Sequence, residues 1–316
     1  MTSDSPIILH LPAGSADWAG MITQFTLQLV ERESKQYATW AGERLLRATR
    51  KSDGVVALAD GRLRGMLLFE IVDQSAELTL PWTLQPDAVL ASELSVAALQ
   101  VLKDDYPNLR YIRAERQLLP GKADPTGLEA AGFACYWRRR MILDLADWRG
   151  EAEIPLGYRI THWHIRYLDL AAEVVYRANL DTLDAELYAP FFGDSPAQCR
   201  KGLLTILAGR YGPIHPQATL CAFTGDSLVG LNLVISEGER LASIVEISVD
   251  PAHQRHGLGR ALLVRSLRML RHENFERVEL AVTQENAPAI RLYDALGFTD
   301  LEGFPVCFRP RTGGHG

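Results

Sequence analysis

The sequence predicts an α/β protein built from two tandem lobes of similar design. The chain has 316 residues, of which 47% are hydrophobic and 23% charged. This composition is typical of a globular protein, and this length favours two domains over one. Both halves also show the same order of predicted elements, and the residues that mark this order recur at a constant spacing. Length, composition and internal similarity therefore indicate the same architecture.

Internal similarity links positions that are 165 residues apart. Residues 55–71 and 220–236 each consist of two apolar runs around a turn, which predicts a β-hairpin. Gly65 and Gly230 in these segments are separated by 165 residues (230 − 65 = 165). The same offset joins two further pairs, Pro86 with Pro251 and Gly132-Phe133 with Gly297-Phe298. A single shift that holds through three anchors favours duplication over coincidence among common turn glycines.

Each half has the same predicted elements in the same order. Helical N-terminal segments come first, followed by the hairpin, a third strand, a long amphipathic helix and a further strand. A short helix, the Gly-Phe pair and a last strand complete each half. In the second half, a β-branched run predicts a strand. Leu263, Leu267 and Leu270 follow it at the spacing of a helix, so the pattern of apolar residues distinguishes the two elements. The expected ranges in the two halves are 76–85 and 242–250 for the third strand, 91–105 and 259–272 for the long helix, and 109–116 and 276–283 for the next strand.

A charged, proline-containing segment separates the two halves. Residues 146–157 (ADWRGEAEIPLG) follow a strand-like run and have the composition of a linker. We therefore expect domains at 1–150 and 151–316.

Charge and cysteine content exclude several classes of protein. The net charge is −6, with 33 basic and 39 acidic residues, and neither half is basic, which argues against a nucleic-acid partner. Arg138, Arg139 and Arg140 are expected at a strand end in solvent. Four cysteines are too few and too scattered for a disulfide scaffold, and no ligand spacing predicts a metal site. With no apolar run long enough for a membrane helix, we expect a cytoplasmic protein without a membrane partner.

The most informative stretch is residues 244–270, in which a strand, a glycine-rich loop and a helix follow one another. Gly257 and Gly259 would let backbone N–H groups approach a ligand, and the helix that follows presents its positive end to an anion. Arg255, His256 and Arg260 surround the same point. The spacing is neither that of a dinucleotide fingerprint nor that of a P-loop.

Two motifs resemble those of the GCN5-related N-acetyltransferases (GNAT). The segment 254–259, QRHGLG, is similar to the Q/R-x-x-G-x-G/A signature of that family, and residues 286–298, NAPAIRLYDALGF, are similar to its second motif. The resemblance implies that each lobe is a mixed, mostly antiparallel twisted sheet flanked by helices, and that the second lobe uses acetyl-CoA. The implied cofactor-binding residues are Ser248, Val249, Gln254, Arg255, His256, Gly257, Leu258, Gly259, Arg260, Ala261, Asn286 and Tyr293.

The first half departs from this pattern. Residues 87–94 occupy the position of the glycine loop after the 165-residue shift, but they contain Asp87 and no glycine. An acidic residue without a glycine pair would repel a phosphate. Leu128 also stands where the second half has Tyr293. We therefore expect a degenerate first lobe and one acetyl-CoA site per chain.

Acetyl transfer to an amine requires a base, a stabilised carbonyl oxygen and a proton for the leaving thiolate. The resemblance implies that a backbone N–H near residues 247–249 binds the oxygen and that Tyr293 supplies the proton. Glu246 is the expected base, and Glu279 on the next strand is its rival. An alternative interpretation of Tyr293 is that it only fills space on a helix.

The acceptor is expected to meet residues before the second hairpin, where acidic and aromatic side chains gather. Asp169, Glu173, Arg177 and Asp181 have helical spacing and predict an ordinary solvated stripe. The expected acceptor contacts are therefore Asp184, Glu186, Tyr188, Phe191 and Phe192.

We expect the chain to move an acetyl group from acetyl-CoA to a primary amine of a small molecule by direct attack in a ternary complex. The alternatives are an acetyltransferase of proteins or peptides and a non-catalytic acyl-CoA-binding regulatory module. The sequence leaves open whether the protein is a monomer or a homodimer.

Overall fold

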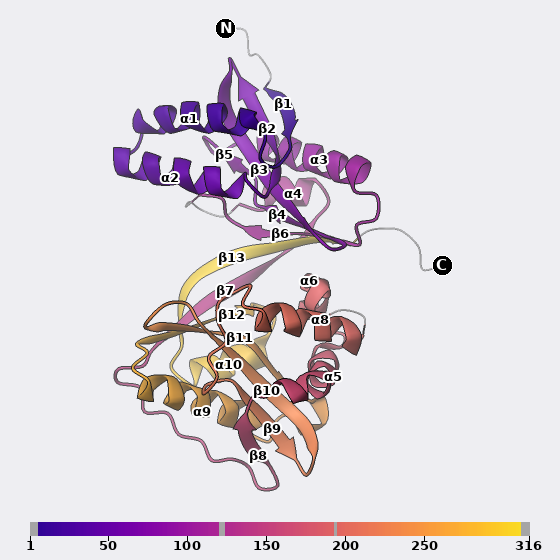
Figure 1. Ribbon diagram of the computed structural model, residues 1–316, viewed down its shortest axis with the longest axis vertical. Helices are drawn as coiled ribbons and strands as arrows, with labels where there is room; N and C mark the ends of the chain where they lie inside the picture. Colours follow the sequence, from indigo (N-terminus) through magenta and orange to yellow (C-terminus); the bar gives the residue numbers. More distant parts are fainter. Residues whose placement is uncertain (1–5, 120–123, 193–194, 311–316) are drawn as a thin grey trace. The chain divides into compact units, whose positions relative to one another are not determined.

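The computed structural model describes residues 6–119, 124–192 and 195–310. The chain forms two compact units (Figure 1). The first unit comprises Met1–Tyr136 and Pro305–Gly316, and the second comprises Trp137–Phe304. Each unit has a twisted sheet with helices on both faces, which confirms the predicted fold class.

The sheet of the first unit has the strand order β1-β2-β3-β4-β6-β13, and the short β5 pairs with β3. Neighbouring strands are antiparallel except for β4 and β6, which are parallel. The predicted hairpin is β2-β3, closed by an Asp60-Gly61 turn in which both residues have positive φ. The strands are β1 (Ile7–Leu11), β2 (Asp53–Ala59), β3 (Arg62–Val72), β4 (Ser75–Thr79), β5 (Trp82–Thr83), β6 (Tyr111–Arg116) and β13 (Thr299–Pro310).

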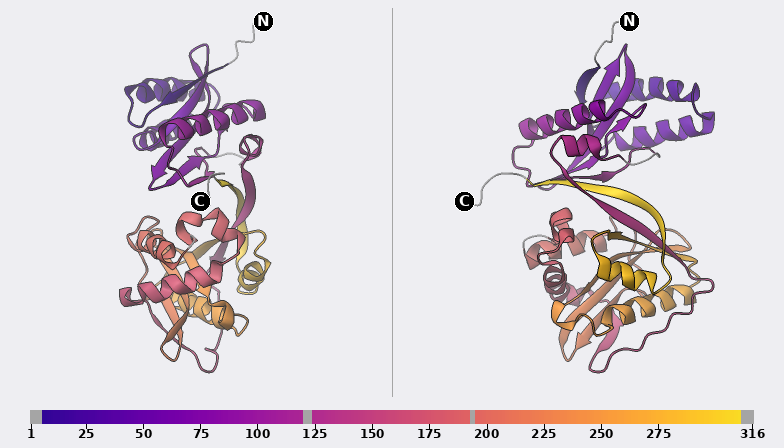
Figure 2. Two further views of the ribbon diagram at one scale, coloured as in Figure 1. Left: turned by 90° about the vertical axis from the view of Figure 1, so that its right-hand side faces the viewer. Right: turned by 180° about the vertical axis from the view of Figure 1, so that it is seen from behind.

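Helices cover both faces of this sheet (Figure 2). The helices α1 (Ala16–Val30) and α2 (Lys35–Ala48) pack on one face, and α3 (Ala88–Asp105) and α4 (Thr126–Ala130) pack on the other. The predicted long helix is α3, which buries Leu90, Leu94, Ala98 and Leu102 at intervals of four residues. This spacing places one apolar stripe against the sheet.

The sheet of the second unit has the order β7-β12-β11-β10-β9-β8. All neighbours are antiparallel except β11 and β12, which are parallel, as β4 and β6 are in the first unit. The hairpin β9-β10 matches the second predicted hairpin. The strands are β7 (Ala134–Asp144), β8 (Arg159–His162), β9 (Leu220–Thr224), β10 (Ser227–Ser236), β11 (Leu241–Val249) and β12 (Arg277–Thr283).

The helices of the second unit also divide between the two faces of its sheet. One face carries α9 (Leu258–His272) and α10 (Ala287–Asp294), and their core contains Leu263, Leu267 and Leu270, the residues that predicted the helix. On the other face lie α5 (Leu168–Asn179), α6 (Leu183–Leu187), α7 (Ala189–Phe192) and α8 (Pro196–Leu207). The 3₁₀ turns η1 (Ile165–Tyr167) and η2 (Pro251–His253) precede α5 and α9.

The two last strands are exchanged relative to the sequence halves. β7 ends the first half of the sequence, yet its residues 138–144 pair with β12 of the second unit. β13 ends the second half, yet its residues 307–310 pair with β6 of the first unit. The compact units therefore divide at Tyr136 and Trp137 and not at the expected 150/151 boundary.

The predicted linker lies against the second unit. The Trp148 indole donates a hydrogen bond to Leu296 O at 2.8 Å, and Arg268 Nε donates to Gly150 O at 3.2 Å. These contacts explain why residues 146–157 belong to one compact unit, although their composition is that of a connecting segment.

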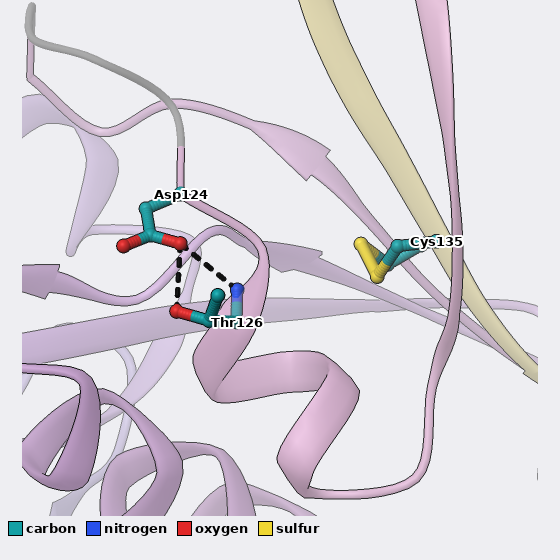
Figure 3. Close-up of a disulfide and its surroundings, with 4 residues drawn as sticks. Asp124, Thr126 and Cys135 are labelled. Carbon is teal, nitrogen blue, oxygen red and sulfur yellow. Dashed lines mark hydrogen bonds between the residues drawn. A yellow bond between two sulfur atoms is a disulfide. The ribbon is translucent and has the colours of Figure 1, made fainter.

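One disulfide bond joins Cys135 of β7 to Cys307 of β13 (Figure 3). Their Cα atoms are 4.0 Å apart, although 172 residues separate them in the sequence. Figure 3 also shows Asp124, whose carboxylate accepts hydrogen bonds from Thr126 at the start of α4. Local sequence patterns do not predict this pairing, because the two cysteines are brought together only by the way β13 pairs. The other two cysteines, Cys199 and Cys221, are buried free thiols.

None of the helices in the described ranges is long and apolar enough to cross a membrane.

Candidate active site

The predicted glycine loop connects β11 to α9 and presents an open helix N-terminus. Gly257 is the N-cap residue of α9 and has a φ of +81°, which favours glycine. Ala261 N donates to Gly257 O at 3.0 Å. The N–H groups that precede Ala261 in the helix point along its axis without an intrahelical acceptor. Since Gly257 has no capping side chain, this end of α9 can accept an anion.

The loop residues contribute in two different ways. Gln254, Arg255, His256 and Gly257 are exposed, and Arg255 has a positive φ of +63°, which is uncommon for a residue other than glycine. Leu258 and Ala261 are buried in the core, so only their backbone can reach a ligand. Three other predicted contacts, Val249, Gly259 and Arg260, are half-buried at the same end of α9.

Two hydrogen bonds fix the loop to its surroundings. Gln254 Nε2 donates to Val249 O at 3.0 Å, which holds the loop against the end of β11. Tyr158 Oη and His253 Nδ1 lie 2.9 Å apart in a second contact. These bonds keep the backbone of the loop in place before any ligand arrives.

The equivalent helix of the first unit is closed by its own side chain. Asp87 is the N-cap residue of α3, and its Oδ1 accepts a hydrogen bond from Leu90 N at 3.0 Å. The carboxylate therefore occupies the position that an anionic ligand would need. This contact agrees with the expectation that the first lobe is degenerate.

The strands β11 and β12 separate beside the glycine loop. Their parallel pairing runs from Leu241 and Arg277 to Ile244 and Leu280, although β11 continues to Val249 and β12 to Thr283. Beyond Ile244 the two described strands no longer form a ladder with each other. The backbone of residues 245–249 is therefore free of a strand partner on the β12 side.

A β-bulge in β11 turns Glu246 toward the α5 face. In the β10-β11 pairing, Leu233 lies opposite Glu246 and Val234 lies opposite Ile244, so Val245 is the extra residue. Ile244 and Ile247 both contact the α9 core, whereas Val245 packs on the α5 side. A regular alternation would have placed Glu246 on the same face as Ile244. The bulge therefore determines which face of the sheet receives the carboxylate.

Glu246 is buried, with 8% of its surface exposed. Ser248 Oγ donates a hydrogen bond to Glu246 Oε1 at 2.5 Å. Burial raises the pKa of Glu246 to about 7, and the nearby Asp184 carboxylate contributes to the same direction. Ser248 and the Arg138 guanidinium act in the opposite direction. A carboxylate with a pKa near neutrality can both accept and release a proton at physiological pH.

Tyr293 is a residue of α10, is 6% exposed and packs in the core that α9 and α10 form on this face of the sheet. Burial raises its pKa above the usual value, and the charge of Glu246 adds to that effect. Its phenol is therefore protonated at neutral pH and within electrostatic range of the expected base. Asn286 caps α10, because its Oδ1 accepts a hydrogen bond from Ala289 N at 3.2 Å, which leaves its Nδ2 as the group able to donate to a ligand.

The structure brings two of the predicted acceptor contacts to this place. Thr283 Oγ1 at the end of β12 donates a hydrogen bond to Asp184 Oδ1 at 2.5 Å. Tyr188, which follows α6, lies under the guanidinium of Arg138, whose Cζ is 4.7 Å from the ring centre. Asp184 and Tyr188 are therefore positioned on the same side of the sheet as Glu246.

The other three predicted acceptor contacts lie apart from this group. Phe191 and Phe192 pack with the α5 and α8 core, and Phe191 lies 6.0 Å from the Tyr211 ring. Glu186 is exposed in the first turn of α6. Their part in acceptor binding stays a prediction.

The acidic stripe behaves as an ion-paired surface. Arg177 contacts Asp250 at 2.7 Å and Glu173 at 3.4 Å, and Arg200 contacts Asp169 at 2.6 Å. Glu279, the rival base, lies opposite Ser243 in the part of β12 that still pairs with β11. It is thus away from the separated strand ends, and the geometry favours Glu246.

Arg138 is a residue whose position the sequence did not predict. The expectation of a solvent-exposed arginine run is wrong for Arg138, because it lies opposite Thr283 in the β7-β12 pairing and donates a hydrogen bond to Ala281 O at 2.7 Å. The next two residues fit the expectation better, since Arg139 and Arg140 form ion pairs with Asp300 and Glu302. Strand alternation predicts that Arg138 and Arg140 point to one face of the sheet and Arg139 to the other. That pattern does not show that Arg138 lies beside the site, which follows from the pairing of β7 with β12.

The sequence model of the acetyltransferase (GNAT) family matches residues 186–298. This segment contains the glycine loop, the separated strands, Glu246 and Tyr293. Residues 186–298 therefore resemble the GNAT acetyltransferase family in sequence. Arg138 and Asp184 lie outside the matched GNAT segment.

Known proteins resemble the chain in sequence over part of its length and in fold over almost all of it. A mycothiol acetyltransferase of Kineococcus radiotolerans is 36% identical over 136 residues, which are 42% of this chain and 44% of that protein. The matches to other curated mycothiol acetyltransferases likewise span less than half of those proteins. Two solved structures share the GNAT fold. A tandem GNAT protein of the clavulanic acid biosynthesis pathway has a TM-score of 0.56 and 18% identity, with 98% of this chain and 99% of that chain covered. A GCN5-related N-acetyltransferase from Sphaerobacter thermophilus has a TM-score of 0.64 and 15% identity, with 96% and 95% covered.

Proposed function

We propose that the second unit transfers an acetyl group from acetyl-CoA to the primary amine of a small molecule by direct attack in a ternary complex. The observation that supports this most is the buried Glu246, turned by a β-bulge into the place where β11 and β12 separate beside an open helix N-terminus. A base, a gap between strands and an anion site are thereby brought together.

Acetyl-CoA would bind with its pyrophosphate at the N-terminus of α9. The backbone N–H groups at Leu258, Gly259 and Arg260 supply donors, and the exposed Arg255 and His256 add basic side chains. The pantetheine arm would then run between the separated strands, with Asn286 on the α10 side. One backbone N–H of residues 247–249 would stabilise the charge that develops on the carbonyl oxygen.

Glu246 would accept a proton from the acceptor amine as the new N–C bond forms. An amine such as that of lysine has a pKa of about 10.4 in water and is mostly protonated, so a base is required. Tyr293 would donate its proton to the sulfur as the C–S bond breaks, which yields the amide and free CoA thiol. Near neutral pH the Tyr293 phenol is protonated, as an acid must be, because burial raises its pKa. Glu246, with a pKa of about 7, is ionised in about half of the molecules at that pH and in more of them as the pH rises.

The acceptor would lie on the α6 side of the strand separation. Asp184 offers a carboxylate to an ammonium group, and Tyr188 offers an aromatic face. The curated relatives are named for mycothiol, which supports a small-molecule acceptor over a protein or peptide. A non-catalytic acyl-CoA-binding module would have no need for a buried carboxylate such as Glu246.

The proposal is tested by incubating the full chain with acetyl-CoA and a panel of amines, aminoglycosides, polyamines and peptides while free thiol is measured. We expect thiol release that depends on a small amine. Release with peptides alone would support the protein-directed alternative. Binding of acetyl-CoA without release in the presence of any amine would support the binding module.

A further inference from the structure

Arg138 lies beside two of the candidate acceptor contacts, Tyr188 and Asp184. It is half-buried on β7, and its guanidinium donates a hydrogen bond to the Ala281 carbonyl and lies over the Tyr188 ring. Directly opposite in the strand pairing is Thr283, which bonds to Asp184. Two independent observations, the strand pairing and the aromatic contact, therefore place the positive charge of Arg138 beside the candidate acceptor contacts.

The charges around Glu246 come from several elements. The charges of Asp184 on α6 and Arg138 on β7 act on the pKa of Glu246. The charge of Glu246 in turn raises the pKa of the Tyr293 phenol on α10. The thiol of Cys199 on α8 is also close enough for the charge of Glu246 to raise its pKa. Glu173 of α5 acts on that thiol as well. Arg138 is the cation among these named groups, so it offsets the negative charge that Asp184 and an ionised Glu246 bring together.

We propose that Arg138 is a positioning residue for acetyl transfer: its fixed guanidinium balances the second carboxylate and so keeps Glu246 available as a base. The role is electrostatic, since Arg138 acts on the reaction through Glu246. It rests on the proposed function, because the base is assigned there. It also adds a residue from a strand that lies outside the matched GNAT segment.

The direct test is a titration of Glu246 in the full chain. The protein is labelled with ¹³C at the glutamate carboxyl, and the Glu246 resonance is assigned by its loss in Glu246→Gln. We expect Arg138→Met to raise the midpoint, because the positive charge of Arg138 favours the ionised form of Glu246 and the variant lacks it. Arg138→Lys keeps the charge and should stay closer to the wild type. If Arg138→Met does not fold, Arg138→Lys and Arg138→Gln provide the comparison.

Arg139→Met is the matched control, because Arg139 is the next residue on β7 and forms an ion pair with Asp300. It should leave the Glu246 midpoint unchanged. A midpoint in Arg138→Met equal to that in Arg139→Met would overturn the proposal. The titration needs no acceptor, so it can fail while the proposed function stands.

The pH dependence of the rate completes the test. With the amine that gives the highest rate, the acid limb of kcat/KM should move upward in Arg138→Met in parallel with the titration. A shifted titration with an unmoved acid limb would show that Glu246 is not the base, and the proposed function would then fail in this respect.

Discussion

The Ser248 hydroxyl donates a 2.5 Å hydrogen bond to the Glu246 carboxylate, two residues earlier on the same strand. This bond favours the ionised form of Glu246, whereas burial opposes it. These two effects, together with the charges of Asp184 and Arg138, determine the pH at which the side chain can act as a base.

Ser248→Ala should raise the pKa of Glu246 and move the acid limb of kcat/KM to higher pH. The matched control is Ser243→Ala on the same strand, because Ser243 donates to a different carboxylate, that of Glu237. A pH–rate profile of both variants tests this difference. Equal profiles would show that the Ser248 bond does not act on the base.

Glu246→Gln should change the pH dependence of stability in a defined direction. The folded state binds the Glu246 proton more tightly than the unfolded chain does, since the pKa rises from 4.5 to about 7. The unfolding free energy of the wild type therefore falls as the pH rises from about 4.5 to about 7, because the folded state loses its more tightly bound proton. Relative to the wild type, the variant should gain about 3 kcal/mol between about pH 4 and pH 8.

Denaturant unfolding at several pH values measures this gain. Glu279→Gln serves as the control. Glu279 is half-buried on β12, and this substitution makes the same replacement of a carboxylate by an amide. A difference between Glu246→Gln and wild type that does not vary with pH would contradict the raised pKa.

Gly257→Val should abolish the binding of acetyl-CoA, because a side chain there would crowd the helix N-terminus and is disfavoured at a φ of +81°. Gly225→Val separates backbone strain from loss of the site, since Gly225 also has a positive φ, +53°, and lies in the turn between β9 and β10 with no atom near its added Cβ. Ser92→Val in α3 probes the equivalent place in the first unit.

Calorimetric titration provides the readout for these three variants. We expect one site per chain in the wild type, Gly225→Val and Ser92→Val, and none in Gly257→Val. Two equivalent sites in the wild type would show that the first unit also binds, and unchanged binding in Gly257→Val would show that the phosphate lies elsewhere.

Tyr293→Phe should lower turnover at least about ten-fold while the affinity for acetyl-CoA is kept, since general acid catalysis typically contributes that much or more. The control is Tyr106→Phe in the first unit, where the hydroxyl donates to Asp53 Oδ2 at 2.8 Å. That variant should lose about 1 kcal/mol of stability and no turnover. Steady-state turnover of the two variants is the measurement. A Tyr293→Phe rate equal to that of Tyr106→Phe would show that Tyr293 only fills space in the core.

The sequence predicted the elements of both units and their order, because their periodicities are local. The run around Leu263, Leu267 and Leu270 became α9, and both hairpins formed where apolar runs flank a turn. The third strand of the first half was expected to reach residue 85, but β4 ends at Thr79 and the short β5 pairs back to β3.

Long-range pairing was beyond what local patterns can show. Nothing in the residues of β7 or β13 specifies that β7 pairs with β12 and β13 with β6. That one exchange explains why the units do not divide after residue 150, why Cys135 meets Cys307, and why Arg138 lies beside β12. Residues 151–316 on their own would lack β7, and β12 would lose its antiparallel neighbour and keep only β11.

The candidate site could be predicted where a motif carried it. The loop, Glu246 and Tyr293 were named from motif and strand position, whereas the bulge at Val245 that directs Glu246 is visible only in the strand register. The acceptor side was less predictable, since short helices place Asp184 and Tyr188 near Arg138 but put Phe191 and Phe192 into the core.

The central claim is that Glu246 is the base of an amine acetyltransferase. The most direct test is the rate of amine-dependent thiol release from acetyl-CoA, measured from about pH 5 to pH 9 for the wild type and Glu246→Gln. We expect the wild-type rate to rise with pH through about 7, the pKa of Glu246, and Glu246→Gln to be at least about a hundred-fold slower. A Glu246→Gln rate close to that of the wild type, with the same rise through pH 7, would contradict it.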